Sequence, residues 1–220
     1  MVETLDQSIG RVLQTLRDLN LDSNTVVLFT SDNGGLSTSE GSPTSNLPLR
    51  GGKGWLYEGG IREPYIIKWP NKAPAGSICE TPVVSTDFYP TILEMAGLPL
   101  TAEQHLDGIS LVPLLTQSGT ITRTDLFWHY PHYSNQGGFP GGAIRSGDFK
   151  LIERFENGEL QLYNLQADIG ERVNLAEAKP GLVKRMRTKL HSWYQEVDAT
   201  FLQPKPGGPQ PWRPSSLSQY

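Results

Sequence analysis

A glycine-rich segment with a single lysine carries the clearest chemical signal in this 220-residue sequence. Residues 49–64 contain five glycines, and Lys53 lies between two of them in Gly52-Lys53-Gly54. Because glycine lacks a Cβ atom, it lets the backbone approach a ligand closely and adopt positive φ. The Lys53 ammonium could therefore contact an anion without steric competition. A lysine in such a loop is more often a solvated surface residue, so the residue types alone leave both interpretations open.

Two oxygen-bearing side chains precede this segment. Asp32 and Asn33 directly follow the apolar residues 25–31 and are followed by two glycines. Ligands in open α/β sheets bind outside the carboxyl ends of strands, and residues 25–31 are predicted to form a buried strand. A carboxylate beside an amide carbonyl suits a hard cation such as Ca²⁺. Asp-Asn-Gly-Gly is also a good turn sequence, and residue types alone favour the turn.

A third candidate is the aromatic segment 127–133, in which two histidines lie three residues apart. His129 and His132 could be metal ligands, or they could join the aromatic side chains in stacking on a sugar ring. An aromatic-rich interface between subdomains explains the segment equally well. We hypothesise that His129, His132 and Arg145 line a pocket for an anionic or hydroxylated substrate.

The first half of the chain is predicted to be α/β. Apolar residues recur at helical spacing over residues 2–19, which predicts an amphipathic helix before the strand at 25–31. A further strand is expected at 65–69, and a helix is expected over residues 85–96, capped by Ser85 or Thr86. A helix followed by an apolar strand suggests a parallel sheet covered on both faces. We therefore expect the remainder of a mixed or parallel α/β sheet.

The second half is predicted to be a small antiparallel sheet with a closing helix. A hairpin turn is expected at residues 156–159, and an amphipathic helix is expected over residues 182–197. Short strands are predicted at residues 126–130, 142–146, 150–155 and 160–164. The expected domains are an α/β part (residues 1–122), a small α+β subdomain (residues 123–202) and a proline-rich tail, extended or disordered (residues 203–220).

Composition excludes several classes of protein. The formal net charge is −4, from 19 basic and 23 acidic residues, and no basic run stands out, which argues against a nucleic-acid partner. No apolar stretch approaches the roughly 20 residues needed to span a bilayer. Cys79 is the single cysteine, so an internal disulfide is impossible.

Residues 25–35 and 49–70 together closely resemble the second signature region of the type I sulfatases. These enzymes are formylglycine-dependent, arylsulfatase-like sulfuric ester hydrolases of the alkaline phosphatase superfamily. The similarity continues through residues 87–97, 106–115, 143–152, 162–171 and 174–175. The resemblance implies that Asp32 and Asn33 supply two Ca²⁺ ligands and that Lys53 contacts the sulfate group. Glu58 and Arg62 are expected to form an ion pair that organises the loop.

The nucleophile of that family is missing from this sequence. Formylglycine is made from the first residue of a C-x-P-x-R or S-x-P-x-R motif, and neither motif occurs here. The resemblance therefore implies the C-terminal portion of a sulfatase, inactive alone, whose formylglycine and other acidic ligands lie in a missing N-terminal part. The implied partner is a sulfated small molecule or glycan, with carbohydrate favoured. The implied location is periplasmic or extracellular.

Two other functions stay open. One is a phosphoric ester hydrolase of the same superfamily, which a threonine or an unmodified serine at the upstream nucleophile position would indicate. The other is a non-catalytic module that binds sulfated glycans.

Overall fold

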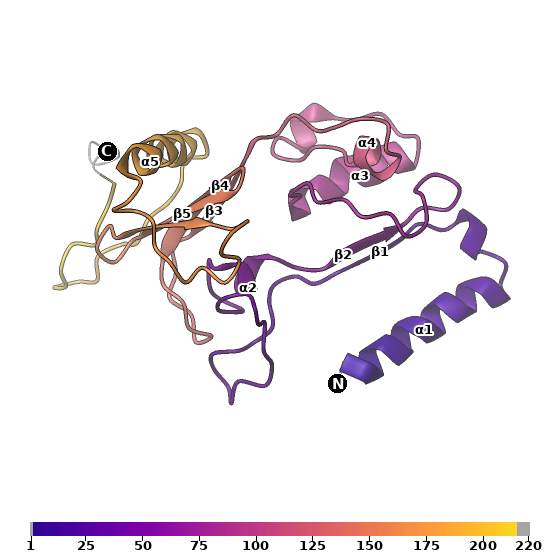
Figure 1. Cartoon of the computed structure of the whole chain (residues 1–220), viewed down its shortest axis with the longest axis horizontal. Helices are drawn as coiled ribbons and strands as arrows, with labels where there is room; N and C mark the ends of the chain where they lie inside the picture. Colours follow the sequence, from indigo (N-terminus) through magenta and orange to yellow (C-terminus); the bar gives the residue numbers. More distant parts are fainter. Residues whose placement is uncertain (1, 215–220) are drawn as a thin grey trace. The chain divides into compact units, whose positions relative to one another are not determined.

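The structure, a computed structural model, describes residues 2–214, so Met1 and residues 215–220 lie outside it. The chain forms two compact units that alternate along the sequence (Figure 1). Within the described residues, unit 1 combines residues 2–30 with Pro64–Arg123, and unit 2 combines Ser31–Glu63 with residues 124–214. The glycine-rich loop thus belongs to the same unit as the C-terminal sheet. The sequence-based division at residues 122 and 202 stays a prediction.

Unit 1 contains the two helices predicted for the first half of the chain and a two-stranded sheet. Its main helices are α1 (Val2–Asp18) and α3 (Phe88–Met95), with a short α4 (Val112–Leu115). The strands are β1 (Val27–Thr30) and β2 (Tyr65–Lys68). The amphipathic helix α1 has no buried residue, and its apolar side chains Val2, Leu5 and Val12 are exposed.

The expectation of a parallel sheet is wrong for the described residues, whose paired strands are all antiparallel. In unit 1, Thr30 lies opposite Tyr65, and Val27 lies opposite Lys68. The connection therefore leaves β1 and enters β2 at the same end of the pair. A parallel pair would need a crossover that returns to the opposite end. The fold is mixed α/β, with antiparallel sheets and a C-terminal helix.

A buried aspartate organises the second part of unit 1. The Asp87 carboxylate accepts hydrogen bonds from the backbone N–H groups of Val84 at 2.9 Å and Ile109 at 3.0 Å. Arg123 donates to both of its oxygens, at 2.6 and 2.7 Å. Charge-assisted and bidentate bonds of this kind are the strong ones in proteins. Asp87 thus fixes the start of α3 against two later segments.

Unit 2 is built on a four-stranded antiparallel sheet in the order β3-β4-β5-β6. The strands follow the sequence prediction closely: β3 (Asp125–Tyr130), β4 (Gly141–Ser146), β5 (Phe149–Arg154) and β6 (Leu160–Asn164). Side chains alternate between the two faces of such a sheet, and directly paired residues share a face. The two faces therefore carry different residues and different neighbours.

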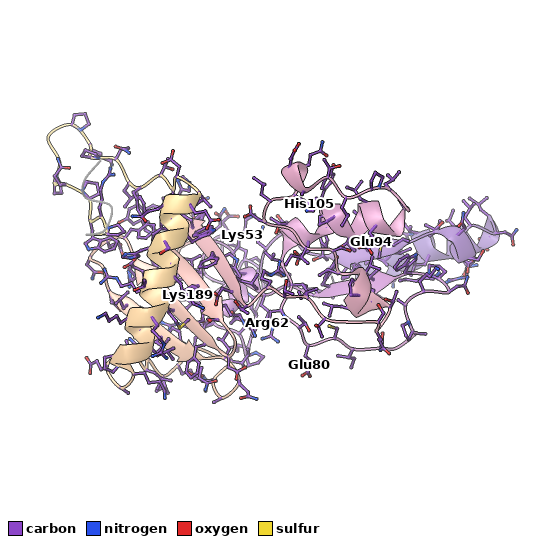
Figure 2. The ribbon with its side chains drawn as sticks, turned by 90° about the horizontal axis from the view of Figure 1, so that it is seen from above. Lys53, Arg62, Glu80, Glu94, His105 and Lys189 are labelled. Carbon is purple, nitrogen blue, oxygen red and sulfur yellow. The ribbon has the colours of Figure 1, made fainter. Side chains whose placement is uncertain are left out.

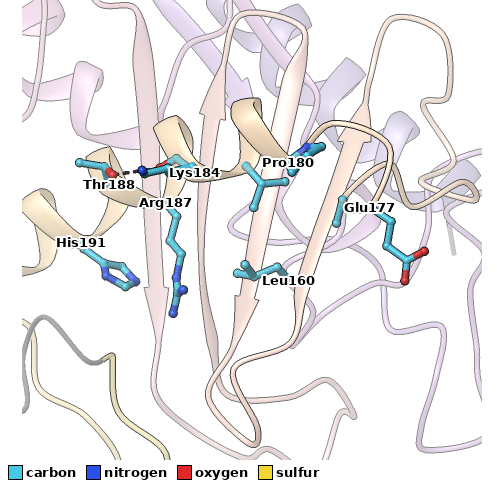
Figure 3. Close-up of a pocket in the computed structure, with 9 residues that line it drawn as sticks. Leu160, Glu177, Pro180, Lys184, Arg187, Thr188 and His191 are labelled. Carbon is cyan, nitrogen blue, oxygen red and sulfur yellow. Dashed lines mark hydrogen bonds between the residues drawn. The ribbon is translucent and has the colours of Figure 1, made fainter.

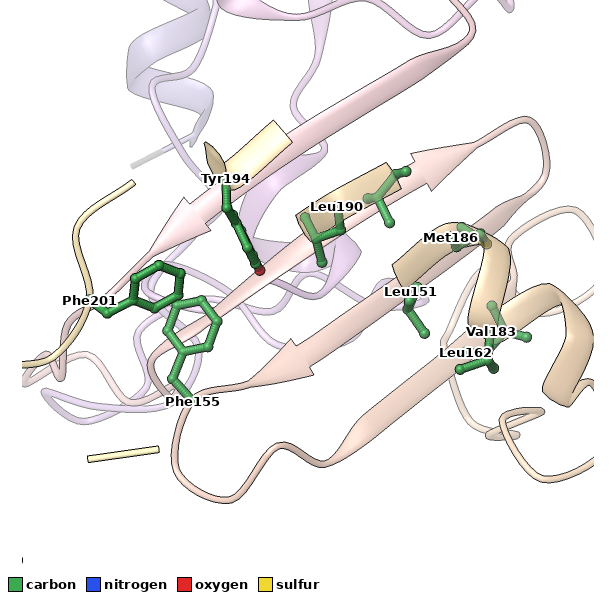
Figure 4. Packing of buried hydrophobic residues seen from close by; sticks show 9 residues of the cluster. Leu151, Phe155, Leu162, Val183, Met186, Leu190, Tyr194 and Phe201 are labelled. Carbon is green, nitrogen blue, oxygen red and sulfur yellow. The ribbon is translucent and has the colours of Figure 1, made fainter. Parts of the chain in front are cut away.

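One face of this sheet packs against the closing helix α5 (Pro180–Glu196). Figure 4 shows the cluster that joins them. The sheet supplies Ile144, Leu151 and Leu162, and the helix supplies Val183, Met186, Leu190 and Tyr194. We call this side the helix face.

The other face packs against the glycine-rich loop, and we call it the loop face. Leu56 and Tyr57 of the loop form a second buried cluster with Ala143, Ile152 and Tyr163 of the sheet. The short helix α2 (Glu58–Ile61) lies in this loop. The loop is therefore held by the core of unit 2.

After α5 the described chain contains neither helix nor strand, although it is not without contacts. The ring of Trp212 stacks on that of Phe155, with centroids 6.0 Å apart. Residues 215–220 of the predicted tail lie outside the described residues. Within the part of the chain that the structure describes, no helix is both long and apolar enough to cross a bilayer.

Candidate active site

Two backbone hydrogen bonds join the segment of Asp32 and Asn33 to the segment of Lys53. The N–H of Gly34 donates to the carbonyl of Gly60 at 3.2 Å, and the N–H of Lys53 donates to the carbonyl of Gly35 at 3.2 Å. The structure therefore brings the two predicted site segments into direct contact within one unit, although they are about twenty residues apart. Backbone contacts of this kind fix where the side chains of the site begin.

The close contact requires glycine at position 34. A Cβ atom built on Gly34 would lie 1.7 Å from the carbonyl oxygen of Gly59. No real Cβ approaches backbone so closely, so a larger residue must push the two segments apart.

We expect Gly34→Ala to lower the free energy of unfolding by about 1–3 kcal/mol, which is the usual cost of overpacking. Gly119→Ala is the matched control, because its Cβ would meet no atom closer than 3.6 Å. Urea unfolding of the two variants checks this. A Gly34→Ala midpoint equal to that of the control would contradict it.

Asn46 bridges the same two segments, and the sequence analysis missed it. Its Nδ2 donates to the carbonyls of Gly35 at 2.8 Å and Gly51 at 3.0 Å. Its Oδ1 accepts from the N–H of Gly35 at 3.1 Å. Nothing in the polar run 37–48 distinguishes this asparagine from its neighbours, because its role depends on contacts distant in sequence.

The bridge borders a groove of 580 Å³ whose lining mixes polar side chains with Leu47, Pro48 and Leu49. Its lining includes Ser37, Thr38, Thr44, Ser45, Asn46 and Arg172. Hydroxyl, amide and guanidinium groups can donate to or accept from a hydroxylated ligand. The groove is thus a candidate site for the polar part of a substrate beside the lysine loop.

A buried ionic network fixes α2 to the sheet. The Nζ of Lys150 lies 3.0 Å from Glu58 Oε1 and 2.9 Å from Glu171 Oε1, and all three side chains are at most 3% exposed. The N–H of Glu58 donates to Glu171 Oε2 at 2.7 Å. Burial raises the pKa of Glu171, an effect that the positive charge of Lys150 opposes.

The predicted ion pair between Glu58 and Arg62 is confirmed, at 3.5 Å. Arg62 is half-exposed, however, and Lys150 is the closer partner of Glu58. Sequence reasoning found the pair because its members lie four residues apart. It missed Lys150 and Glu171, whose separation from Glu58 exceeds ninety residues.

Arg50 and two tyrosines extend the network. The Arg50 guanidinium lies 3.9 Å from the centroid of the Tyr57 ring and donates to the Tyr163 hydroxyl at 3.1 Å. Gln161 Oε1 accepts from the Tyr57 hydroxyl at 2.8 Å. Burial raises the pKa of Tyr163 to about 12, so it stays a neutral hydrogen-bonding group.

Lys53 lies in the same glycine-rich loop and is partly buried (it is labelled in Figure 2). Among the described residues, no carboxylate forms an ion pair with its ammonium, and no acceptor forms a hydrogen bond with it. The backbone of the lysine is fixed while its charge is unpaired. This arrangement suits contact with an anionic ligand.

Asp32 and Asn33 supply oxygen donors of the kind that Ca²⁺ prefers. Asn33 Nδ2 donates to Asp32 Oδ2 at 2.6 Å, so the two side chains converge. Burial, and then the charge of Asp32, raise the pKa of Glu63. Within the described residues, no group of three or more histidine, cysteine or acidic side chains is arranged to hold a metal ion. The donors present fit part of a hard-cation site.

The three residues expected to line a substrate pocket are not brought together. His129 pairs with Gly142 and lies on the helix face, whereas Arg145 pairs with Leu126 and lies on the loop face. His132 follows β3, and its ring contacts that of Tyr130. The pocket formed by all three stays a hypothesis that this geometry does not support.

His129 occupies an aromatic cluster instead. Its ring lies 5.1 to 5.4 Å from those of Phe155, Tyr194 and Phe201. Nε2 donates to the carbonyl of Thr200 at 2.6 Å, and Nδ1 is buried without a partner in the described chain. Burial lowers the pKa of His129, because the cluster disfavours the charged ring.

We expect this shift to make stability depend on pH. With the folded pKa below the unfolded value of about 6.5, only the unfolded state takes up the proton as the pH first falls below that value. The stabilisation is therefore present above about pH 6.5 and is lost progressively as the pH falls. His129→Gln keeps a donor for Thr200 and should show a smaller decrease in unfolding free energy between about pH 7 and pH 5. Parallel pH profiles for the two proteins would contradict this expectation.

Comparisons with known proteins identify the family of this chain. The sequence matches two family models. One, described as Sulfatase, matches residues 1–98, and the other, described as N-sulphoglucosamine sulphohydrolase, C-terminal, matches residues 52–198. The chain belongs to the sulfatase family, and it corresponds to the C-terminal portion of longer members.

Individual relatives are consistent with this assignment. A sulfatase of Formosa agariphila is 40% identical over 215 residues, covering 87% of this chain and 38% of the relative. The structure of Ps i-CgsB in complex with k-i-k-neocarrahexaose has a TM-score of 0.73 at 30% identity, covering 88% of this chain and 41% of that one. BT4656 in complex with its substrate D-glucosamine-2-N,6-O-disulfate has a TM-score of 0.73 at 25% identity, covering 90% and 39%. The chain thus spans about two fifths of the length of these relatives.

Proposed function

We propose that this chain is the C-terminal part of a sulfuric ester hydrolase that cleaves a sulfate ester of a carbohydrate. In this proposal Lys53 contacts the sulfate group, and Asp32 and Asn33 are two ligands of a Ca²⁺ ion. The observation that carries the proposal is the pair of backbone hydrogen bonds that joins the Asp32–Asn33 segment to the Lys53 loop. Family membership gives those residues their roles.

Lys53 would act electrostatically. Its ammonium is unpaired within the described chain. It would partly neutralise the negative charge on the ester oxygens and the further charge that develops on them during cleavage. Such groups are most effective when they are oriented before the substrate binds, and the packed loop provides that orientation. A bound Ca²⁺ would supply further positive charge at the same oxygens.

A carbohydrate substrate is supported by the groove beside the loop and by the ligands of two neighbours. The lining of the groove includes Ser37, Thr38 and Thr44, together with Arg172. The solved relatives bind a neocarrahexaose and a disulfated glucosamine. His132 and Arg145 stay candidates for substrate contact, each taken separately.

We further propose that the nucleophile and the remaining acidic ligands lie in a part of the enzyme outside this chain. The chain covers only 38% of the Formosa agariphila sulfatase, and the apolar side chains Val2, Leu5 and Val12 of α1 are exposed here. An additional part of the protein that covers α1 would bury them. By analogy with the family, the enzyme is proposed to be exported.

The test begins with the DNA upstream of Met1 in the same reading frame. An extension with two adjacent aspartates and a C-x-P-x-R or S-x-P-x-R motif is expected. The whole frame, co-expressed with a formylglycine-generating enzyme, should release sulfate from sulfated saccharides, whereas the 220-residue chain should not.

The same experiment separates the alternatives. Phosphate release by an enzyme with a threonine or an unmodified serine nucleophile would establish a phosphoric ester hydrolase instead. Saccharide binding without any hydrolysis by the complete frame would establish a non-catalytic module.

A further inference from the structure

A second groove lies on the helix face of the unit 2 sheet, beside α5 (Figure 3). Its volume is 490 Å³, and none of the sequence motifs draws attention to it. Leu160 and Val183 supply apolar lining, and Lys184, Arg187, His191 and Glu177 supply polar lining. A largely apolar cavity with a few polar groups is the usual form of a small-ligand site.

The central feature of the groove is an arginine held by a buried carboxylate. Glu153 is fully buried, and its Oε1 accepts from the Nε of Arg187 at 2.8 Å. His191 Nε2 lies 2.9 Å from Glu153 Oε2 and is the donor, because an ionised carboxylate only accepts. Two side chains of the groove are thus fixed from below by one acid. Orienting them in advance lowers the entropic cost of binding a ligand.

The Arg187 contact uses Nε, which leaves the two Nη groups for another acceptor. About a third of the Arg187 side chain (35%) stays exposed, so these groups are accessible from the groove. A planar guanidinium can bind a sulfate or carboxylate with two parallel hydrogen bonds. Lys184 lies one helical turn away on the same side of α5 and adds a second positive charge.

The two ends of the groove carry side chains of opposite charge. Lys184, Arg187 and His191 follow one another along α5, whereas the Glu177 carboxylate lies at the far end from His191 (Figure 3). An anionic group would therefore bind at the arginine end, and hydroxyl groups could donate to Glu177. The apolar lining between them suits the face of a ring. An acidic saccharide unit has this combination of features.

The groove is distinct from the lysine loop. Glu153 pairs with Gly142, on the helix face, whereas Lys150 and Ile152 point to the loop face. A ligand beside Arg187 therefore lies across the sheet from the segment that holds Lys53.

We propose that this groove is a second, non-catalytic site that binds an acidic saccharide unit through Arg187 and Lys184. It would hold a sulfated polymer at a point away from the ester that is cleaved. The choice of a saccharide ligand rests on the proposed function, whereas the anion site rests on the groove itself.

The test is a titration of the 220-residue chain with N-acetylglucosamine 6-sulfate. Backbone amide NMR locates the binding site, and calorimetry measures the affinity. We expect shifts in residues 177–191 and an affinity reduced about tenfold by Lys184→Gln, since losing one charged hydrogen bond costs about a factor of ten. Lys184 is exposed, so this variant should fold normally. Arg185→Gln is the matched control, because it removes one positive charge from the same helix at a position outside the groove lining. It should change the affinity by less than about twofold.

Each other outcome counts against the proposal. Equal losses in the two variants would mean non-specific attraction to the helix, and unshifted amides at 177–191 would mean that the groove is not a site. Equally tight binding of inorganic sulfate would overturn the assignment of a saccharide. The titration repeated on Lys53→Ala should be unchanged, so a failure of the proposed hydrolase activity would leave this result standing.

Discussion

Replacing Lys53 by alanine in the complete enzyme should lower kcat for sulfate release by about 100- to 1000-fold, the usual effect of removing one preorganised group that stabilises transition-state charge. The reason is that its ammonium, unpaired in the described chain, is the positive charge that the glycine-rich loop presents. Neutral alanine leaves the developing negative charge without that partner. Steady-state kinetics on a sulfated saccharide measures the effect.

The control is Lys72→Ala, which removes an exposed lysine in unit 1. It should leave kcat unchanged. Lys53→Arg should recover part of the activity, because it restores the charge without the compact shape of an ammonium. A well-folded Lys53→Ala enzyme with wild-type kcat would show that the lysine has no part in catalysis.

The sequence was sufficient for much of the local structure of unit 2, which holds this lysine. Alternating apolar residues and turn residues identified the four strands of unit 2, and helical spacing identified α5. Glycines in two separate segments predicted a close approach of the backbone to a ligand; in the structure, Gly34 and Gly60 instead bring the two segments themselves into contact. Short-range patterns determine these features, so they can be recognised without the fold.

The sequence did not predict the features of the fold and of the site that depend on strand pairing. An apolar strand after a helix suggested a parallel sheet, but the direction of β2 is set by where the intervening loop returns. His129 and Arg145 looked like members of one pocket until the register placed them on opposite faces. A shift of one residue along a strand reverses the face, and that detail is set by tertiary contacts.

Lys150 shows the same limit for charged residues. In the sequence it is one lysine in a short strand, beside an exposed-looking turn. In the structure it is fully buried between Glu58 and Glu171, from segments far away in the chain. A lysine can be buried in this way only because two carboxylates compensate its charge, and those carboxylates can be identified only from the fold.

Replacing Lys150 by methionine should lower the free energy of unfolding of unit 2 by about 3–5 kcal/mol, the typical cost of removing one member of a buried ion pair. The change leaves two buried carboxylates close together without their common cation. Four of the five tryptophans lie in unit 2, so fluorescence during urea unfolding reports mainly on this unit.

The matched control is Lys189→Met, which breaks the pair of Lys189 with Asp125 on a side chain that is 49% exposed. That variant should lose no more than about 1 kcal/mol, because surface pairs contribute little. Adding Glu58→Gln to Lys150→Met should recover part of the loss by removing one of the uncompensated charges. If Lys150→Met were as stable as the control, the network could not be what anchors α2. Since α2 begins at Glu58, five residues after Lys53, the loop would then depend on its glycine contacts and on the packing of Leu56 and Tyr57 against the sheet.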